Sequence, residues 1–310
     1  MTTDVAPVRL TVEERRALVQ ASARRTLRRR TVYSGAFMVA AASALVVALV
    51  PLASILYDIV TKGWKFLSIA YFTKPELVPP PFEHSISSVG GISNAITGSL
   101  LIDGLAVAMA IPISIVLSIT LYESSNLFMR SFRRIIEVMV GLPSILFGLF
   151  VYAFVVTPMG YQRTALAGAI SLALLMVPVM TVAGEDALRS VPATLTEAAL
   201  ALGARRSRIM GRVVLPYALP RVLTGILLSL SRAVGETAPL LLIIGSSFST
   251  HWSPLSQQTT LPLLIFDNVA NTDPIVRESA WAIALILVAA VFVINLGSRI
   301  IVARTQKGRA

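Results

Sequence analysis

Two charged side chains, Arg232 and Glu236, lie well inside the stretch 220–245, which is apolar overall and has Arg221 at its boundary. An arginine at the middle of a membrane helix costs about 2.5–3.5 kcal/mol, so it normally faces a water-filled path or a partner charge. The two residues are four apart, and on a helix this spacing lets their side chains meet. A guanidinium also presents a planar fork that fits the oxygens of phosphate or sulfate. We therefore expect a cation on the path of an anion; the alternative is a buried ion pair that only fixes helix packing.

Two small residues belong with this pair. Helical spacing places Ser229, Arg232, Glu236 and Pro239 on one stripe of the predicted helix. Gly235 has no side chain and leaves room for the close approach of a neighbour. The predicted substrate-path residues are Arg232, Glu236, Ser229 and Gly235.

A second candidate element lies in the polar segment 186–219. Pro192 suits the first turn of a helix, and the alanines and leucines after it favour helix through Leu202. Gly203 is suited to ending that helix in a left-handed conformation. The segment therefore predicts a short surface helix with a face of small residues, which a partner chain can approach closely.

The sequence lacks the motifs of several catalytic and metal-binding classes. It contains no cysteine, and its two histidines, His84 and His251, are far apart, so we predict no metal site. It has no His-Glu-x-x-His, no Gly-x-Ser-x-Gly and no Gly-x-x-x-x-Gly-Lys-Ser/Thr run. We therefore predict no catalytic residue, and a membrane enzyme is the least favoured of the functions considered. Any ATP hydrolysis is expected to occur in another chain.

The composition predicts the elements that position these residues. Of the 310 residues 55% are apolar and 14% are charged, and the mean hydropathy is +0.76; soluble domains usually carry about 25% charged residues. A bilayer-crossing helix needs about 20 mostly apolar residues. Six stretches meet this length: 33–57, 94–122, 135–157, 165–184, 220–245 and 279–301. We predict an all-α membrane protein with six transmembrane helices and the divisions 1–32 (basic tail), 33–60 (first helix), 61–93 (external segment), 94–303 (core, with loop 186–219) and 304–310 (tail).

The distribution of basic residues predicts the orientation. With both termini in the cytoplasm, 21 of the 27 Lys and Arg residues fall inside and five fall outside, which is a strong positive-inside bias. This bias explains the net charge of +11 without nucleic acid, and we exclude a nucleic-acid partner because no soluble basic domain is present. Thr11 and Glu14 have capping-box spacing at the start of a helix in the basic tail. The arginines of that tail suit anionic lipid headgroups, and the tail serves either as a topology anchor or as a contact for a partner.

The loop 186–219 resembles the Glu-Ala-Ala loop of ABC-importer permeases. The matching residues are Glu197, Ala198, Ala199, Gly203, Leu215 and Pro216, while Val213 replaces the usual isoleucine. The resemblance implies that this loop is the coupling helix, which sits in a cleft of the ATPase subunit.

Three further segments resemble permeases of phosphate importers, the PstA/PstC type. Residues 231–240 read Ser-Arg-Ala-Val-Gly-Glu-Thr-Ala-Pro-Leu, and 141–148 and 90–100 resemble the third-span motif and the entry to the second span. The resemblance covers about residues 85–303 and implies a MetI-like core of five helices in the bacterial cytoplasmic membrane. It also implies a second permease chain (PstC-like), ATPase subunits that bind ATP and Mg (PstB-like) and an external phosphate-binding protein (PstS-like). No cofactor is expected in this chain.

Several alternatives remain at this point. A permease for another oxyanion, sulfate or molybdate, would share the coupling loop, and a proton-coupled secondary transporter would use Glu236 as its proton carrier. The external segments 62–93 and 248–278 suit either the membrane interface or the docking of a soluble partner. For Asp103, in the outer part of the second span, we expect snorkelling or pairing.

Overall fold

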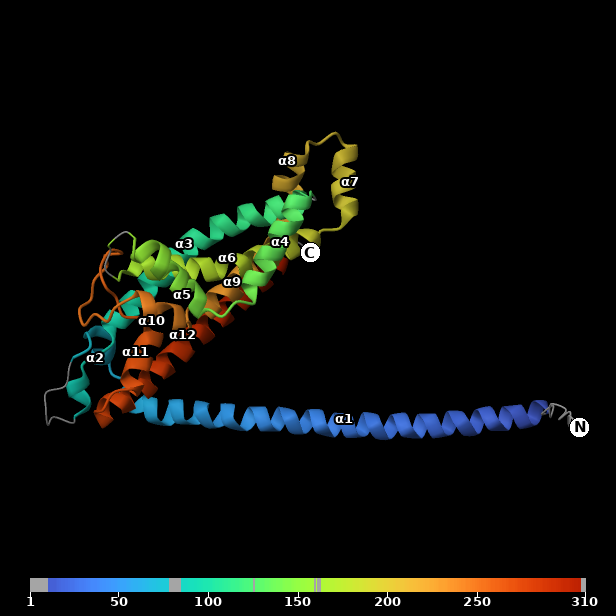
Figure 1. Ribbon diagram of the computed structural model, residues 1–310, viewed down its shortest axis with the longest axis horizontal. Coiled ribbons are helices and arrows are strands. Elements are labelled where there is room, and N and C mark those ends of the chain that lie inside the picture. The colour runs from blue at the N-terminus through green and yellow to red at the C-terminus, as the bar shows by residue number, and fades with distance from the viewer. Residues whose placement is uncertain (1–10, 78–84, 125, 159, 161–162, 308–310) are drawn as a thin grey trace, which may run out of the picture. The chain divides into compact units, whose positions relative to one another are not determined.

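The computed structural model describes residues 11–77, 85–124, 126–158, 160 and 163–307 (Figure 1). Within these residues the regular structure is helical, apart from one isolated bridge between Glu76 and Gly90. The chain divides into two units, residues 1–57 and 58–310. The predicted all-α class is confirmed for the described residues.

The first unit consists of helix α1 (Val12–Gly63), whose last six residues belong to the second unit. The helix begins directly after Thr11 and runs through the basic tail into the apolar stretch without a break. The helix predicted in the tail is therefore present, and it continues as the first span. Pro51 lies inside the helix.

The second unit contains four long helices and several short ones. The long helices are α3 (Ser93–Glu123), α6 (Ala165–Arg189), α9 (Leu215–Ala233) and α12 (Pro274–Lys307). The short elements are η1 (Trp64–Phe66), α2 (Ile69–Thr73), η2 (Ile86–Val89), α4 (Leu127–Val140), α5 (Ile145–Val151), η3 (Tyr152–Val156), α7 (Ala193–Ala201), α8 (Arg206–Ile209), η4 (Met210–Val214), α10 (Ala238–Ile243) and α11 (Leu261–Val269). Among the described residues five helices are long and apolar enough to cross a membrane, and a bent pair makes up to six.

The third predicted span, 135–157, is wrong as a single continuous helix. Helices α4 and α5 meet at an angle of 111° across the break between Val140 and Ile145. Pro143 lacks an N–H group and disfavours helical conformation in the residue before it. The last turn of α4 tightens accordingly, since Gly141 N donates to Val138 O at 3.0 Å and Leu142 N to Met139 O at 3.2 Å.

The fifth predicted span is wrong at both ends. The apolar helix long enough to cross a membrane is Arg206–Ala233, and it includes α8, the π-helical η4 and α9. It stops at Ala233, and α10 starts five residues later with Pro239 in its first turn. Since Pro239 has no N–H to bond within a continuing helix, it suits the beginning of a new one. The chain leaves α10 in an extended conformation at Ile244.

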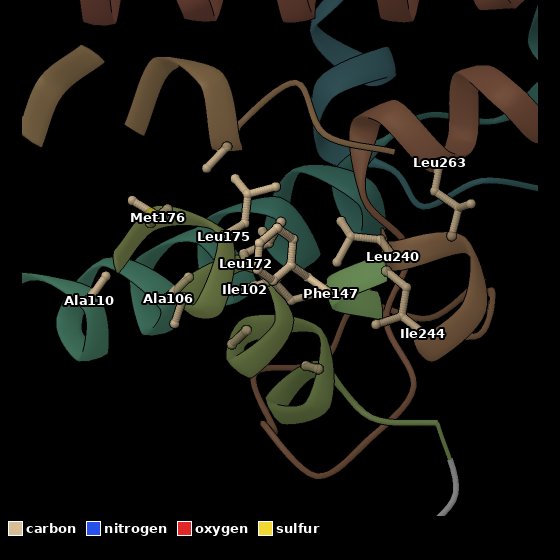
Figure 2. Close-up of a cluster of buried hydrophobic side chains, with 14 of the residues drawn as sticks. Ile102, Ala106, Ala110, Phe147, Leu172, Leu175, Met176, Leu240, Ile244 and Leu263 are labelled. Carbon is tan, nitrogen blue, oxygen red and sulfur yellow. The ribbon is translucent and has the colours of Figure 1, made fainter. Parts of the chain in front are cut away.

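Helix α6 lies at the centre of the second unit and packs against α3, α9, α4 and α5. Figure 2 shows the core around it, where Leu172 and Met176 of α6 meet Ile102 of α3, Phe147 of α5 and Leu240 of α10. The contact between α3 and α6 is close because small residues line it. A Cβ at Gly184 would lie 2.4 Å from Ser118 Oγ.

The segment 244–260 covers the first turns of α3. Asn94 Nδ2 donates to Ser247 O at 2.7 Å, and Leu261 N donates to Ser99 Oγ at 2.9 Å. A Cβ at Gly98 would lie 2.0 Å from Thr259 O, so a glycine is required for this approach. Polar contacts that are buried or partly buried thus hold this segment on the first turns of α3.

Candidate functional site

Arg232 lies in the last turn of α9, and Glu236 lies in the turn between α9 and α10. Their side chains meet as predicted, with Arg232 Nε 3.4 Å from Glu236 Oε1. The Arg232 side chain is 47% exposed, whereas that of Glu236 is 16% exposed. Because this is the single polar contact of the Arg232 side chain within the described residues, its two Nη groups remain able to bind another acceptor.

The predicted common stripe of Ser229, Arg232, Glu236 and Pro239 is wrong, because the helix ends at Ala233. Ser229 is buried, and its hydroxyl has no hydrogen-bond partner in the described part of the chain. It therefore does not lie on the exposed face that carries Arg232.

Gly235 is exposed in the turn between α9 and α10, where its N–H donates to Arg232 O at 3.2 Å. The nearest atom to a Cβ built there, Arg232 O, would be 3.8 Å away. No side chain or backbone of the described residues approaches Gly235 closely. If Gly235 makes room for a neighbour, as expected, that neighbour belongs to a partner outside this chain.

Contacts on two sides hold this turn in place. Ser231 Oγ lies 3.1 Å from Asn295 Oδ1, which links α9 to α12 next to Arg232. On α5 a Cβ at Gly148 would lie 2.6 Å from Pro239 O, so the backbones of α5 and α10 are in direct contact. Sequence reasoning missed both contacts, although Ser231 and Asn295 are polar residues within apolar runs.

The predicted surface helix is present as α7 (Ala193–Ala201), with Pro192 at its N-cap. It ends at Ala201, one residue earlier than predicted, and Gly203 follows in the predicted left-handed conformation with a φ of +78°. Gly203 N donates to Leu200 O at 2.8 Å and Ala204 N donates to Ala199 O at 3.1 Å, which is the Schellman pattern. This cap fixes where α7 stops.

The family-motif residues of the loop 186–219 divide between two elements. Glu197 and Ala198 are exposed on α7, and Ala199 is half-buried against the cluster of Ile209 and its neighbours. Leu215 and Pro216 do not lie in a loop but begin α9, within the spanning helix.

An ion-pair cluster that sequence reasoning missed lies at the α7 end of the unit. Glu185, near the end of α6, is buried and contacts two arginines, Arg133 of α4 and Arg189 of its own helix. Glu185 and Arg189 are four residues apart at the end of an apolar run, which is the only local signal for the cluster.

Asp103 is half-buried on α3 and has no hydrogen-bonding or ionic partner among the described residues, so the expected pairing is not found there. The described residues contain no group of three metal-ligating side chains. His84 lies outside the described residues, and His251 is exposed.

The segment before α3 contains one perturbed acid. Burial, with a smaller contribution from the nearby charge of Asp267 on α11, raises the pKa of the Glu76 carboxyl to about 7. The hydrogen bond to Asn94 acts in the opposite direction. Glu76 therefore changes its charge near neutral pH.

The sequence is similar to one family of transport proteins and to several of its curated members. Residues 110–307 match the family described as binding-protein-dependent transport system inner membrane component. The phosphate transport system permease protein PstA 1 of Mycobacterium tuberculosis is 35% identical over 267 residues, which cover 84% of this chain and 85% of the relative. PstA of Yersinia pestis is 36% identical over 259 residues, covering 81% and 84%. A probable PstA of Methanocaldococcus jannaschii is 34% identical over 242 residues, covering 77% and 83%.

Solved structures agree on the fold. A chain of the inward-facing MetNI methionine ABC transporter matches with a TM-score of 0.54 and 18% identity, covering 69% of this chain and 94% of that chain. A chain of a bacterial ABC transporter involved in alginate import matches with a TM-score of 0.51 and 14% identity, covering 68% and 79%. The predicted MetI-like permease fold is confirmed, and the chain belongs to the inner membrane components of binding-protein-dependent transport systems and, within them, to the PstA permease family.

Proposed function

We propose that this chain is a transmembrane permease subunit of an ATP-driven importer of inorganic phosphate and forms one half of the translocation path. The observation that carries the proposal is the state of Arg232. It is a half-exposed guanidinium at a helix break within an apolar part of the chain, and among the described residues its side chain has one long contact, to the Glu236 carboxylate. Membrane-embedded arginines mark ion or substrate paths by default. The PstA relatives, which are named phosphate transport system permeases, support the choice of anion.

Glu236 limits how tightly Arg232 holds the anion. A path must bind its substrate strongly enough for entry and weakly enough for release. Since Glu236 is mostly buried and contacts Nε, it orients the guanidinium and does not occupy the two Nη groups. Phosphate and Glu236 then compete for one cation, which keeps the residence time of the anion short.

The partners follow from the same assignment. A second, PstC-like permease chain supplies the other half of the path, and PstB-like ATPase subunits bind ATP and Mg. An external PstS-like protein delivers phosphate. The cytoplasmic side of the bacterial membrane carries the α7 end of the second unit and the two terminal tails, 1–32 and 304–310. This orientation places most basic residues in the cytoplasm. Glu197, Ala198 and the exposed Leu202 then form the surface on which the ATPase docks.

Uptake of labelled phosphate into membrane vesicles carrying the complete transporter tests the path. Arg232→Ala is expected to reduce uptake by roughly one to two orders of magnitude, since a charge-assisted contact to an anion contributes about 1.5–3 kcal/mol. Arg232→Lys keeps the charge without the planar fork and is expected to retain part of the uptake. Arg221→Ala, an exposed arginine on the same helix, is the matched control. Normal uptake by Arg232→Ala at normal abundance would refute the role of Arg232.

The same vesicles separate the proposal from its rivals. Competition by unlabelled sulfate or molybdate at least as effective as that by phosphate would assign the path to another oxyanion. Uptake that stops on collapse of the proton gradient while ATP remains present would favour a secondary transporter that uses Glu236 as proton carrier.

A further inference from the structure

The buried carboxylate of Glu185 connects three helices. Arg133 Nε donates to Glu185 Oε2 at 3.1 Å, and Arg133 Nη2 contacts Glu185 Oε1, so the two side chains form a fork-to-fork pair between α4 and α6. Arg133 Nη2 also donates to Leu121 O in the last turn of α3 at 3.1 Å. Arg189 adds a contact of 2.8 Å from within α6 itself. A charge that is buried and bound in this way fixes α4, α6 and α3 to each other at one point.

This point lies directly before the surface helix α7. Helix α6 ends at Arg189, and a short connection leads to Pro192 at the N-cap of α7. The connection is held by bonds to α6: Ser190 Oγ donates to Ala187 O at 2.6 Å, and Val191 N donates to Leu188 O at 3.2 Å. Since Val191 is buried, a displacement of α7 is passed to the last turn of α6. Helix α7 lies beyond the ends of α3 and α4 in Figure 1.

Helix α4 leads from this point to the candidate site. It continues, across the 111° bend, into α5. The backbone of α5 at Gly148 touches that of α10 at Pro239 with no space for a side chain between them. Figure 2 shows Phe147 of α5 and Leu240 of α10 packed in the same cluster. Pro239 is three residues after Glu236, so a shift of α5 displaces the turn that holds Arg232 and Glu236.

We propose that Glu185 is a positioning residue of the transport cycle: through Arg133 it makes the bent pair α4–α5 follow α7, and the pair in turn moves the Arg232–Glu236 turn. The inference rests on the proposed function, because it takes α7 as the helix that the ATPase moves. It assigns different roles to the two arginines. The bond to Arg133 crosses between helices and transmits motion, whereas the bond to Arg189 stays within α6 and does not.

The test compares Glu185→Gln, Arg133→Gln and Arg189→Gln in the complete transporter, with Glu137→Gln, an exposed acid on α4, as control. The readout is labelled phosphate taken up per ATP hydrolysed, which a merely structural role would leave unchanged in the assembled fraction. Glu185→Gln and Arg133→Gln are expected to lower this ratio roughly tenfold, a usual size for coupling between sites. Arg189→Gln and the control are expected to stay within about twofold of the parent, as most surface substitutions do. An unchanged ratio in Arg133→Gln, or an equal drop in Arg189→Gln, overturns the inference.

A second readout does not depend on the transported anion. Because the chain has no cysteine, Gly235→Cys provides a single reporter in the exposed turn. Its rate of reaction with a maleimide is measured with and without ATP in the parent and in Arg133→Gln. We expect ATP to change the rate severalfold in the parent and to have little effect in Arg133→Gln. Equal responses in both, or no response in the parent, overturn the inference. Uptake is measured in the cysteine-free parent, because Gly235 is a predicted path residue. A response of Gly235→Cys to ATP together with no phosphate uptake by the cysteine-free parent refutes the proposed function alone.

Discussion

A pair of glycines in α3 allows the packing of the 244–260 segment to be tested quantitatively. Gly98 and Gly104 lie in the interior of the same helix. A Cβ at Gly98 would lie 2.0 Å from Thr259 O and 3.3 Å from the Cβ of Gln258, whereas a Cβ at Gly104 would meet nothing within 4 Å. Thr259 has little freedom to retreat, because its Oγ1 accepts from Ser247 N at 2.7 Å. Gly98→Ala therefore forces α3 and this segment apart, and Gly104→Ala does not.

The magnitude follows from two opposing effects. Replacing Gly by Ala inside a helix stabilises it by about 1 kcal/mol, and this gain applies at both positions. Inserting a methyl group into a closely packed contact costs about 1–3 kcal/mol, and this cost applies only at Gly98. The helix term cancels in the comparison, so Gly98→Ala is expected to be less stable than Gly104→Ala by about 1–3 kcal/mol. For a chain of this size, that difference corresponds to a melting temperature lower by on the order of 5 °C.

The assay is thermal unfolding of both variants and the parent, purified in the same detergent and lipid. Gly98→Ala is expected to melt below the parent and Gly104→Ala at or above it. If both variants melt together, or if Gly98→Ala melts higher, the close approach of Thr259 to α3 is wrong, and so is the argument that glycine is required there.

Two further predictions concern helix α7 and the segment before α3. Glu197→Lys on α7 is expected to separate ATP hydrolysis from uptake, with Glu137→Lys on α4 as control; ATPase binding and transport at parental levels would remove α7 from coupling. For Glu76 the folded pKa of about 7 lies above its ordinary 4.5, so its contribution to stability is full below pH 4.5 and is lost as the pH rises through about 7. That contribution amounts to about 3 kcal/mol at most, at about 1.4 kcal/mol per pH unit. Glu76→Gln is expected to flatten the fall of the melting temperature between about pH 5 and pH 8, while the exposed Glu278→Gln keeps the parental slope; equal slopes in the two would contradict the burial of Glu76.

The number and order of the spans were predictable because length and hydropathy decide which stretches enter a bilayer. The two breaks were not predicted, although the sequence contains their causes. Pro143 and Pro239 remove backbone donors, and each lies close to a glycine. Both stretches were assigned as continuous because their apolar length fits one membrane crossing. Whether a proline bends a helix or divides it depends on what packs beside it, as α10 packs on α5 at Pro239.

The candidate site was predictable only where its contacts are local in the sequence. Spacing by four residues indicated that Arg232 and Glu236 meet, and they do so although a turn rather than a helix brings them together. The Glu185 cluster was missed because Arg133 is 52 residues away in the sequence. Its main contact depends on how α4 packs against α6, which no local pattern encodes.

The contrast between the two ion pairs bears on the alternative that Arg232 only fixes packing. A pair that fixes packing is expected to be buried and bound by several short contacts, since an unpaired buried charge is costly. Glu185 fits this description: its side chain is 6% exposed and contacts two arginines, one of which also binds a backbone carbonyl. Arg232 has the opposite character: its side chain is 47% exposed and, within the part of the chain that the structure describes, makes one polar contact, of 3.4 Å. A guanidinium with open donors in an apolar span gains most from an acceptor that comes from outside the chain. The geometry therefore favours assigning the connection between helices to Glu185 and the anion to Arg232.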